Sequence, residues 1–229
     1  MSKLKEEVSR DDEGRIKDRR STFNGKLEGE YISYFGNGQV TARLHFVNGL
    51  REGEAFSYHE NGQVREKGFF KNDLLEGAYI SYYDDGHIKE TENYKNGKLD
   101  GEYTSYYQNG QISDRENFKD GKFHGDYIAY YKDGKIREKG CFRDDKREGE
   151  YVAWYQSGQM KEKGLFKNGK LEAPIQTFPV ETEEADDDGY DGMPIALGLD
   201  SLMEKEKRID DLLQGLRDLE KEQKEQKET

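Results

Sequence analysis

Residues 101–124 read GEYTSYYQNGQISDRENFKDGKFH, and this stretch decides the fold. It contains two turn signals, Asn109-Gly110 and Asp120-Gly121, between segments rich in tyrosine, isoleucine and phenylalanine. Asn-Gly and Asp-Gly accept the positive φ angles of tight hairpin turns, and aromatic and β-branched residues favour strands. The connections are too short for a helical crossover, so the strands must be antiparallel. The stretch therefore predicts a pair of antiparallel strands bounded by turns.

The same pattern recurs every 24 residues. One glycine and one aromatic residue mark each unit without a slip, and self-similarity at a fixed short period is the signature of a repeat array. The markers are Gly29, Gly53, Gly77, Gly101, Gly125 and Gly149, and Phe46, Phe70, Tyr94, Phe118, Phe142 and Phe166. The sequence predicts an all-β fold in which tandem 24-residue β-hairpin repeats form an elongated antiparallel meander, followed by a C-terminal α-helix.

The repeat divides the chain into four parts. Six full units span residues 29–172, and capping half-units extend the array to residues 14–180. Residues 1–13 are expected to be a disordered N-terminus. Residues 181–200 carry eight acidic and no basic side chains and predict an acidic linker. Residues 201–229 predict an amphipathic helix with a charged tail.

The C-terminal segment begins with Ser201, which can cap a helix together with Glu204. Apolar residues then recur at helical spacing, at Leu202, Ile209, Leu212, Leu216 and Leu219. This stripe fits a coiled coil formed by self-association or docking in a partner's groove, and it equally fits a solitary helix that lies on the sheet or frays in water. The sequence leaves these alternatives open.

The even length of the unit keeps each repeat position on one face of the sheet. We expect two-residue turns, so that Phe35 pairs with Val40, and Leu44 pairs with Gly53 across the following turn. One face is expected to be packed, with an aromatic ring lying across each strand glycine, as Phe118 would cover Gly101. It collects Tyr31, Phe35, Val40 and Phe46 with their equivalents, together with Leu75, Leu99, Phe123 and Leu171.

The other face is expected to carry one exposed aromatic residue per unit, and we call this series the aromatic row. Its members are Tyr34, Tyr58, Tyr82, Tyr106, Tyr130 and Trp154. The expected register places a cation opposite several of them: Arg65, Lys89, Arg137 and Lys161, facing Tyr58, Tyr82, Tyr130 and Trp154. A regular aromatic row suits a recognition surface, although such cross-strand pairs also stabilise any sheet. These ten residues are the candidate partner-binding site.

A series of carboxylates is the strongest candidate for chemistry. Its members are Glu66, Glu90, Asp114, Glu138 and Glu162, with Tyr79, Tyr103, Tyr127 and Tyr151 predicted beside them. Paired carboxylates can hydrolyse glycosides, but a catalytic site is one place and these residues recur in most units, so hydrogen bonding to tyrosine is favoured. The four histidines occupy four different repeat positions, and Cys141 is expected to fill space. We expect no enzymatic activity, cofactor or metal.

Charge and composition restrict the partner. The six units carry 22 basic and 25 acidic side chains, so no basic stripe exists for nucleic acid or an anionic membrane. No apolar run reaches the length of a membrane span, and the first 20 residues lack the apolar stretch of a signal peptide, so we expect neither. A single cysteine fits a reducing compartment. A cytoplasmic protein that binds another protein is therefore expected.

The motifs YYQNGQ (residues 106–111) and FKNGK (residues 166–170) carry a resemblance to a known family. Over about residues 14–172 the chain resembles the MORN-repeat variant of bacterial proteins named YwqK-family antitoxins. The resemblance implies an elongated sheet of hairpins that binds a partner, and the family label implies neutralisation of a toxin. We therefore expect a non-enzymatic, antitoxin- or immunity-like masking protein, and the alternative is a structural scaffold that recruits proteins or membrane.

Overall fold

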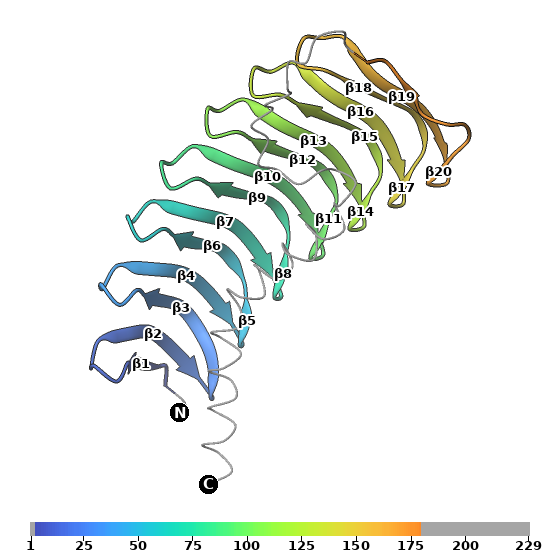
Figure 1. Ribbon diagram of the computed structural model, residues 1–229. Coiled ribbons are helices and arrows are strands. Elements are labelled where there is room, and N and C mark those ends of the chain that lie inside the picture. Colours follow the sequence, from blue (N-terminus) through green and yellow to red (C-terminus); the bar gives the residue numbers. More distant parts are fainter. Residues whose placement is uncertain (1–2, 180–229) are drawn as a thin grey trace. The chain divides into compact units, whose positions relative to one another are not determined.

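The computed structural model describes residues 3–179, and these form a single 21-stranded antiparallel sheet. The hairpins follow one another in chain order along a curved array (Figure 1). The strands are β1 (Lys5–Arg10), β2 (Ile16–Phe23), β3 (Lys26–Tyr34), β4 (Val40–Val47), β5 (Leu50–Arg51), β6 (Gly53–Tyr58), β7 (Val64–Lys71), β8 (Leu74–Leu75), β9 (Gly77–Tyr82), β10 (Ile88–Lys95), β11 (Lys98–Leu99), β12 (Gly101–Tyr106), β13 (Ile112–Lys119), β14 (Lys122–Phe123), β15 (Gly125–Tyr130), β16 (Ile136–Arg143), β17 (Lys146–Arg147), β18 (Gly149–Trp154), β19 (Met160–Lys167), β20 (Lys170–Leu171) and β21 (Gln176–Thr177). The predicted all-β repeat fold is confirmed, whereas the predicted acidic linker and C-terminal helix lie outside the described residues.

The second turn of each unit has the predicted two-residue form. Val47 pairs with Leu50 around Asn48 and Gly49, whose φ angles are 54° and 86°. Both values lie in the left-handed region that Asn and Gly accept more readily than other residues. The Asn-Gly signal therefore predicts this turn correctly.

The first turn differs from the prediction. Phe35 N–H donates to the Gln39 carbonyl at 2.7 Å, so the loop between them has three residues and Phe35 does not pair with Val40. Tyr34 pairs with Val40 instead, and Ser33 pairs with Ala42. The residue between Val40 and Ala42 is the extra residue of a β-bulge, a common companion of three-residue hairpin loops. The same bulge follows the first turn of every full unit.

The glycines that recur every 24 residues, such as Gly53, lie at a corner where the chain passes from a short strand to the next long strand. Phe46 pairs with Arg51, but Arg43 pairs with Phe56, so the chain from Arg51 to Phe56 contains two more residues than the strand opposite. The predicted pairing of Leu44 with Gly53 is therefore wrong. Gly53 has a φ of 92°, a conformation that L side chains avoid. The turn geometry, and not a covering ring, explains this glycine.

The predicted ring over Gly101 is also wrong. A Cβ at Gly101 would lie nearest to the Asn93 side chain, at 3.3 Å, although Gly101 does pair with Phe118 in register. Aromatic rings cover a different glycine position, because a Cβ at Gly140 would lie 2.6 Å from the Tyr127 ring. The principle of a ring over a strand glycine therefore holds, at another position of the unit.

The core runs along the array as a stack of side chains from successive units. The Phe123 ring lies between Phe118 and Phe142, with centroid distances of 4.4 Å and 5.3 Å. Arg51 takes the same place in another unit, with its guanidinium 4.2 Å from the Phe70 ring centroid. Four tyrosines at equivalent positions, Tyr31, Tyr79, Tyr103 and Tyr151, meet this stack edge-on. We call this side of the sheet the core face.

Two predictions for the packed face are not met: one repeat position lies on the other face, and Leu171 is exposed at the end of the array. The residues equivalent to Val40 pair with the aromatic row because of the bulge, and three of them are exposed: Ile88, Ile136 and Met160. Leu171 has 44% of its surface exposed, whereas the equivalent Leu75, Leu99 and Phe123 are buried, since the described array provides no further complete hairpin to cover Leu171.

The array begins earlier than predicted. Residues 5–10 form β1 and pair with β2, so residues 1–13 are not a disordered terminus throughout. Ser9 donates a hydrogen bond to Asp18, and Arg20 Nε lies 3.3 Å from Glu7, so polar side chains of β1 and β2 contact one another across the strand pair. At the other end, Gln176 and Thr177 in β21 pair with β19, as a capping half-unit requires.

Candidate binding face

The side of the sheet opposite the core face carries the aromatic row, and we call it the open face. All six row members are half-buried. Each pairs across its hairpin with an aliphatic residue or methionine, which we call the aliphatic row: Val40, Val64, Ile88, Ile112, Ile136 and Met160. Aromatic and aliphatic partners side by side stabilise the hairpin and leave an apolar stripe at the surface.

The predicted cation partners of the row are wrong. The bulge turns Arg65 toward Ser57 and Glu66, with its Nε donating to Ser57 Oγ at 3.3 Å. Arg137 lies 3.7 Å from Glu138 in the same way. Lys161 lies 5.2 Å from the Tyr155 ring. Lys89 is the extra residue between the paired positions Ile88 and Glu90, and so does not face Tyr82.

The cations of the open face occur two repeat positions further along the second strand. They pair with the residues equivalent to Ile32 and comprise Arg43, Lys67, Arg115, Lys139 and Lys163. Lys139 Nζ lies 5.6 Å from the Trp154 ring centroid. Arg43 pairs with Glu30 at 3.2 Å, so part of this cation series is offset by neighbouring carboxylates. Sequence reasoning missed these residues because their placement depends on a three-residue loop, and the Asn-Gly signal does not specify the length of the loop.

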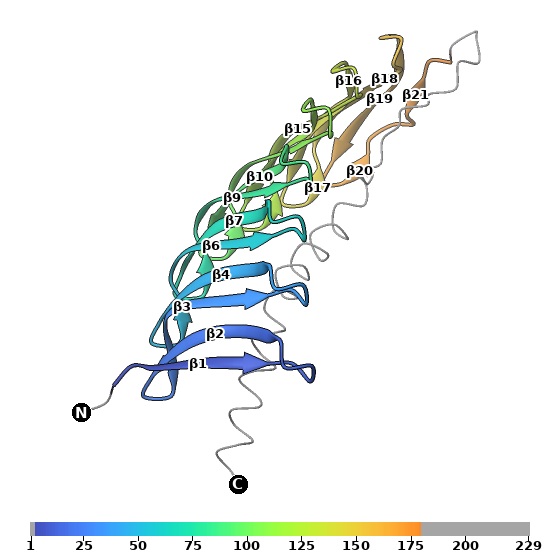
Figure 2. The same ribbon diagram turned by 90° about the vertical axis from the view of Figure 1, so that its left-hand side faces the viewer.

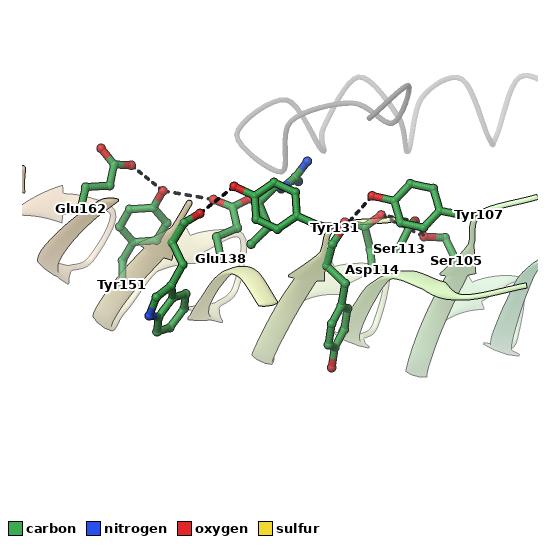
Figure 3. Close-up of polar contacts among 11 residues, drawn as sticks. Ser105, Tyr107, Ser113, Asp114, Tyr131, Glu138, Tyr151 and Glu162 are labelled. Carbon is green, nitrogen blue, oxygen red and sulfur yellow. Dashed lines mark hydrogen bonds and ion pairs between the residues drawn. The ribbon is translucent and has the colours of Figure 1, made fainter. Parts of the chain in front are cut away.

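The row members are held in place through their backbone carbonyls. Tyr107 Oη donates to the Tyr130 carbonyl at 2.6 Å, and Tyr131 Oη donates to the Trp154 carbonyl at 2.7 Å. Figure 3 shows the Tyr107 and Tyr131 rings projecting from the same side of the sheet as Glu138 and Tyr151. Equivalent bonds reach the Tyr106 carbonyl from Tyr83 and the Tyr82 carbonyl from His59. The preceding unit thus anchors four of the row residues, namely Tyr82, Tyr106, Tyr130 and Trp154.

The carboxylate series lies on the core face beside tyrosines, as predicted. Tyr151 Oη donates to Glu162 at 2.7 Å and lies 3.1 Å from Glu138 (Figure 3). Tyr103 donates to Glu90 at 3.1 Å. Burial, followed by the neighbouring carboxylates, raises the pKa of Tyr151 and of Tyr103 well above the usual value. Neutral phenols that donate to carboxylates form a structural lattice, which is what the sequence favoured over a catalytic pair.

Residues 3–179 contain neither a metal-ligand cluster nor a membrane-spanning helix. Within this range, no group of three or more His, Cys, Asp or Glu side chains is arranged to hold a metal ion. The same range contains no helix that is long and apolar enough to cross a membrane.

Comparison with known families identifies the repeat. The model of the MORN repeat variant matches residues 27–48, 51–72, 75–96, 99–120, 123–144 and 147–168. No curated protein matches the chain. The six matches cover more than half of the 229 residues, and the chain therefore belongs to the MORN repeat variant family. Repeats of this kind generally bind proteins or membranes and are not catalytic, and the match carries no antitoxin assignment.

Proposed function

We propose that this member of the MORN repeat variant family is a non-enzymatic protein that binds a protein partner along the aromatic row. The observation that carries the proposal is the row itself, which the core does not use: its six residues stay half-buried on the open face, while other aromatic residues fill the core. Tyrosine and tryptophan dominate the energetic centres of protein interfaces.

The anchoring of the row supports binding further. The carbonyls of Tyr82, Tyr106, Tyr130 and Trp154 accept hydrogen bonds from the preceding unit, which fixes the backbone beneath each ring. A surface ordered before binding loses less conformational entropy when the partner arrives. The open face is therefore suited to a partner with a complementary rigid surface.

Masking of a partner is the finer form of this proposal. A continuous row over six units can cover an extended surface on a second protein, as an antitoxin- or immunity-like protein must do in the cytoplasm. A scaffold that recruits proteins or membrane is the second candidate, and it is favoured by the general behaviour of these repeats. Stoichiometry separates the two candidates, because masking needs one tightly bound protein per chain and a scaffold holds several.

The test begins with affinity purification of the intact chain from its own host. The captured partner is then titrated against the double variant Tyr82→Ser, Tyr106→Ser, because the central members of a row are expected to matter most. We expect the affinity to fall by a hundredfold or more, which corresponds to about 3 kcal/mol. Thermal melting should change far less, since this face is already partly in contact with water.

A matched control uses the terminal pair, Tyr34→Ser and Trp154→Ser, for which a smaller loss of affinity is expected. Unfolding of the central double variant would show that the row is a second core. Normal binding by the folded central variant would place the partner on another surface and contradict the proposal.

A further inference from the structure

Arginine takes the place of an apolar core residue at two points of the array. Arg51 in β5 pairs with Phe46, and Arg147 in β17 pairs with Phe142, so both occupy the repeat position that holds Leu99 in another unit. A cation among aromatic rings loses part of its hydration and needs an acceptor or an anion to compensate for the loss. The two arginines differ in whether the described chain provides one.

Arg51 binds a carboxylate of its own chain. The Asp73 carboxylate accepts hydrogen bonds from the Arg51 backbone N–H and from Arg51 Nε, both at 2.8 Å. Asp73 lies in the turn between β7 and β8, and its N–H donates to the Arg51 carbonyl at 3.0 Å, which holds the turn beside the arginine. Charge-assisted hydrogen bonds of this kind are stronger than those between neutral groups.

The same backbone donor binds a carboxylate in a second unit. Phe123 is the residue equivalent to Arg51 there, and its N–H donates to the Asp145 carboxylate at 2.9 Å. Phe123 has no guanidinium, so the backbone N–H binds the carboxylate without one. A carboxylate beside this repeat position is therefore a recurring arrangement of the described array.

Arg147 has both donors but lacks the carboxylate. Gly169 N–H donates to the Arg147 carbonyl at 2.9 Å, so Gly169 takes the place that Asp73 takes beside Arg51, and glycine has no side chain. Among residues 3–179, no hydrogen bond or ion pair of the Arg147 guanidinium is found. Its Cζ lies 4.7 Å from the Tyr151 ring centroid, and three further rings surround it. Arg147 is half-buried, so a ligand can reach it.

We propose that the guanidinium and backbone N–H of Arg147 form a binding site for a carboxylate of an acidic protein segment. The bound group would supply the charge that Asp73 supplies beside Arg51. Aromatic rings such as Tyr151 would hold the planar guanidinium in place, since arginine stacks on ring faces. The site lies on the core face, where β17 and β20 run along one edge of the array (Figure 1 and Figure 2), whereas the proposed function uses the open face.

The acidic segment can come from a second protein or from the chain itself. Residues 181–188 read ETEEADDD and carry six carboxylates, so the chain holds one candidate. The formal net charge of the chain is -12, which means that an acidic probe is not attracted to the protein in general. Saturable binding of such a probe would therefore report a local site.

The test uses the full chain labelled with ¹⁵N and a terminally blocked peptide with the sequence ETEEADDD. The Nε–H and backbone N–H signals of Arg147 are followed by nuclear magnetic resonance. We expect both signals to shift saturably with the same dissociation constant, because one carboxylate contacts both donors. A control peptide, in which glutamine and asparagine replace every glutamate and aspartate, should produce no saturable shift.

A neutralised chain distinguishes the two sources of the carboxylate. If the ligand belongs to a second protein, the intact and the neutralised chain should bind the peptide with affinities within threefold of each other. If the chain fills its own site, the neutralised chain should bind at least tenfold more tightly, and its Arg147 Nε–H signal should differ before peptide is added. Either result supports the carboxylate site. The substitutions are Glu181→Gln, Glu183→Gln, Glu184→Gln, Asp186→Asn, Asp187→Asn and Asp188→Asn.

A matched pair of glycine variants tests the site without changing the arginine. Gly169→Asp supplies the missing carboxylate from within the chain, and its φ of 79° is close to the 68° of Asp73, so it should weaken peptide binding at least tenfold. Gly121→Asp places the same charge at the equivalent turn beside Leu99, where no guanidinium stands, and should leave the affinity within threefold.

Arg147→Leu removes the guanidinium and should also weaken binding at least tenfold. It should fold, because Leu99 fills the equivalent position in another unit, and thermal melting checks this. The Tyr82→Ser, Tyr106→Ser variant should bind the peptide normally, so failure here is distinguishable from failure of the proposed function.

Three results would overturn the proposal. The first is the absence of a saturable shift at Arg147 in both the intact and the neutralised chain up to millimolar peptide. The second is an equal shift with the amide control peptide. The third is equal weakening by Gly169→Asp and Gly121→Asp, which would show general charge repulsion instead of a site.

Discussion

Replacement of Tyr131 by phenylalanine tests how successive units are joined. Tyr131 has 2% of its surface exposed, and its hydroxyl donates to the Trp154 carbonyl at 2.7 Å. Tyr131→Phe keeps the ring and removes only this donor. The first unit already carries Phe35 at the equivalent position, so a ring without a hydroxyl fits the site.

The expected loss of stability depends on how well the Trp154 carbonyl is satisfied once its donor is removed. A hydrogen bond of this kind contributes about 1 kcal/mol net, and a buried acceptor left without its donor costs about 1–3 kcal/mol. We expect Tyr131→Phe to lower the free energy of unfolding by about 1–2 kcal/mol. For a chain of this size that corresponds to a fall in melting temperature of about 2–8 °C.

The assay is urea unfolding followed both by circular dichroism and by the fluorescence of Trp154, the only tryptophan in the chain. The two signals are compared because repeat arrays need not unfold in a single step. Tyr155→Phe is the matched control, since no hydrogen bond from the Tyr155 hydroxyl is found within residues 3–179, and it should change stability by less than about 0.5 kcal/mol. Equal effects of the two substitutions would refute the inference that the hydroxyl joins neighbouring units.

Three further predictions concern backbone, pH and lipid. Gly101→Val should destabilise the array by about 1–3 kcal/mol, because the φ of 122° at Gly101 suits a β-branched residue poorly, and an unchanged melting temperature would contradict the corner geometry. Burial raises the pKa of Tyr31 to about 12, so the folded state holds the phenolic proton more tightly than the unfolded state does. The stability that this phenol contributes should therefore be complete below pH ~10 and lost as the pH rises through about 12. Urea unfolding at pH 8 and at pH 11 would reveal the loss. In sedimentation with anionic vesicles, the near-neutral array should not co-pellet at physiological salt, and strong salt-sensitive pelleting would favour the membrane scaffold.

The sequence predicted the strands and the core because both depend on spacing. The order of the strands follows from the 24-residue period, the aromatic marker and the two-residue turn at Asn48-Gly49. The same features decide parity, that is, which of the two faces of the sheet a side chain occupies, at most positions. Parity then assigns Tyr31 and Phe46 to the core face, where they are buried. The predicted tyrosine–carboxylate contacts follow from the same parity, as in the bond from Tyr103 to Glu90.

The cation positions could not be obtained in this way because the bulge adds one residue to the second strand. The extra residue reverses, at that point, which face of the sheet the side chains occupy. Asn37-Gly38 is compatible both with a two-residue turn and with the three-residue loop that the chain adopts. In each unit, the longer loop moves the residue opposite the aromatic row by one position. As a result, Val64 faces Tyr58, and Arg65 turns to the core face. A glycine at a turn specifies the left-handed conformation but does not specify how many residues the turn contains.

The length of the aromatic row bears on the size of the partner. Neighbouring strands lie about 4.8 Å apart, so a unit of two long strands advances the array by about 10 Å, and the five steps from Tyr34 to Trp154 span about 50 Å. A small molecule would contact one or two units, and selection for its binding would leave the other units free to lose their aromatic residue. Every unit keeps an aromatic residue there, and each of these residues faces an aliphatic residue or methionine rather than a charged one. Cross-strand pairing alone favours an apolar pair in every unit, and the length of the row is the reason why the proposed partner is a protein that contacts several units rather than a small molecule.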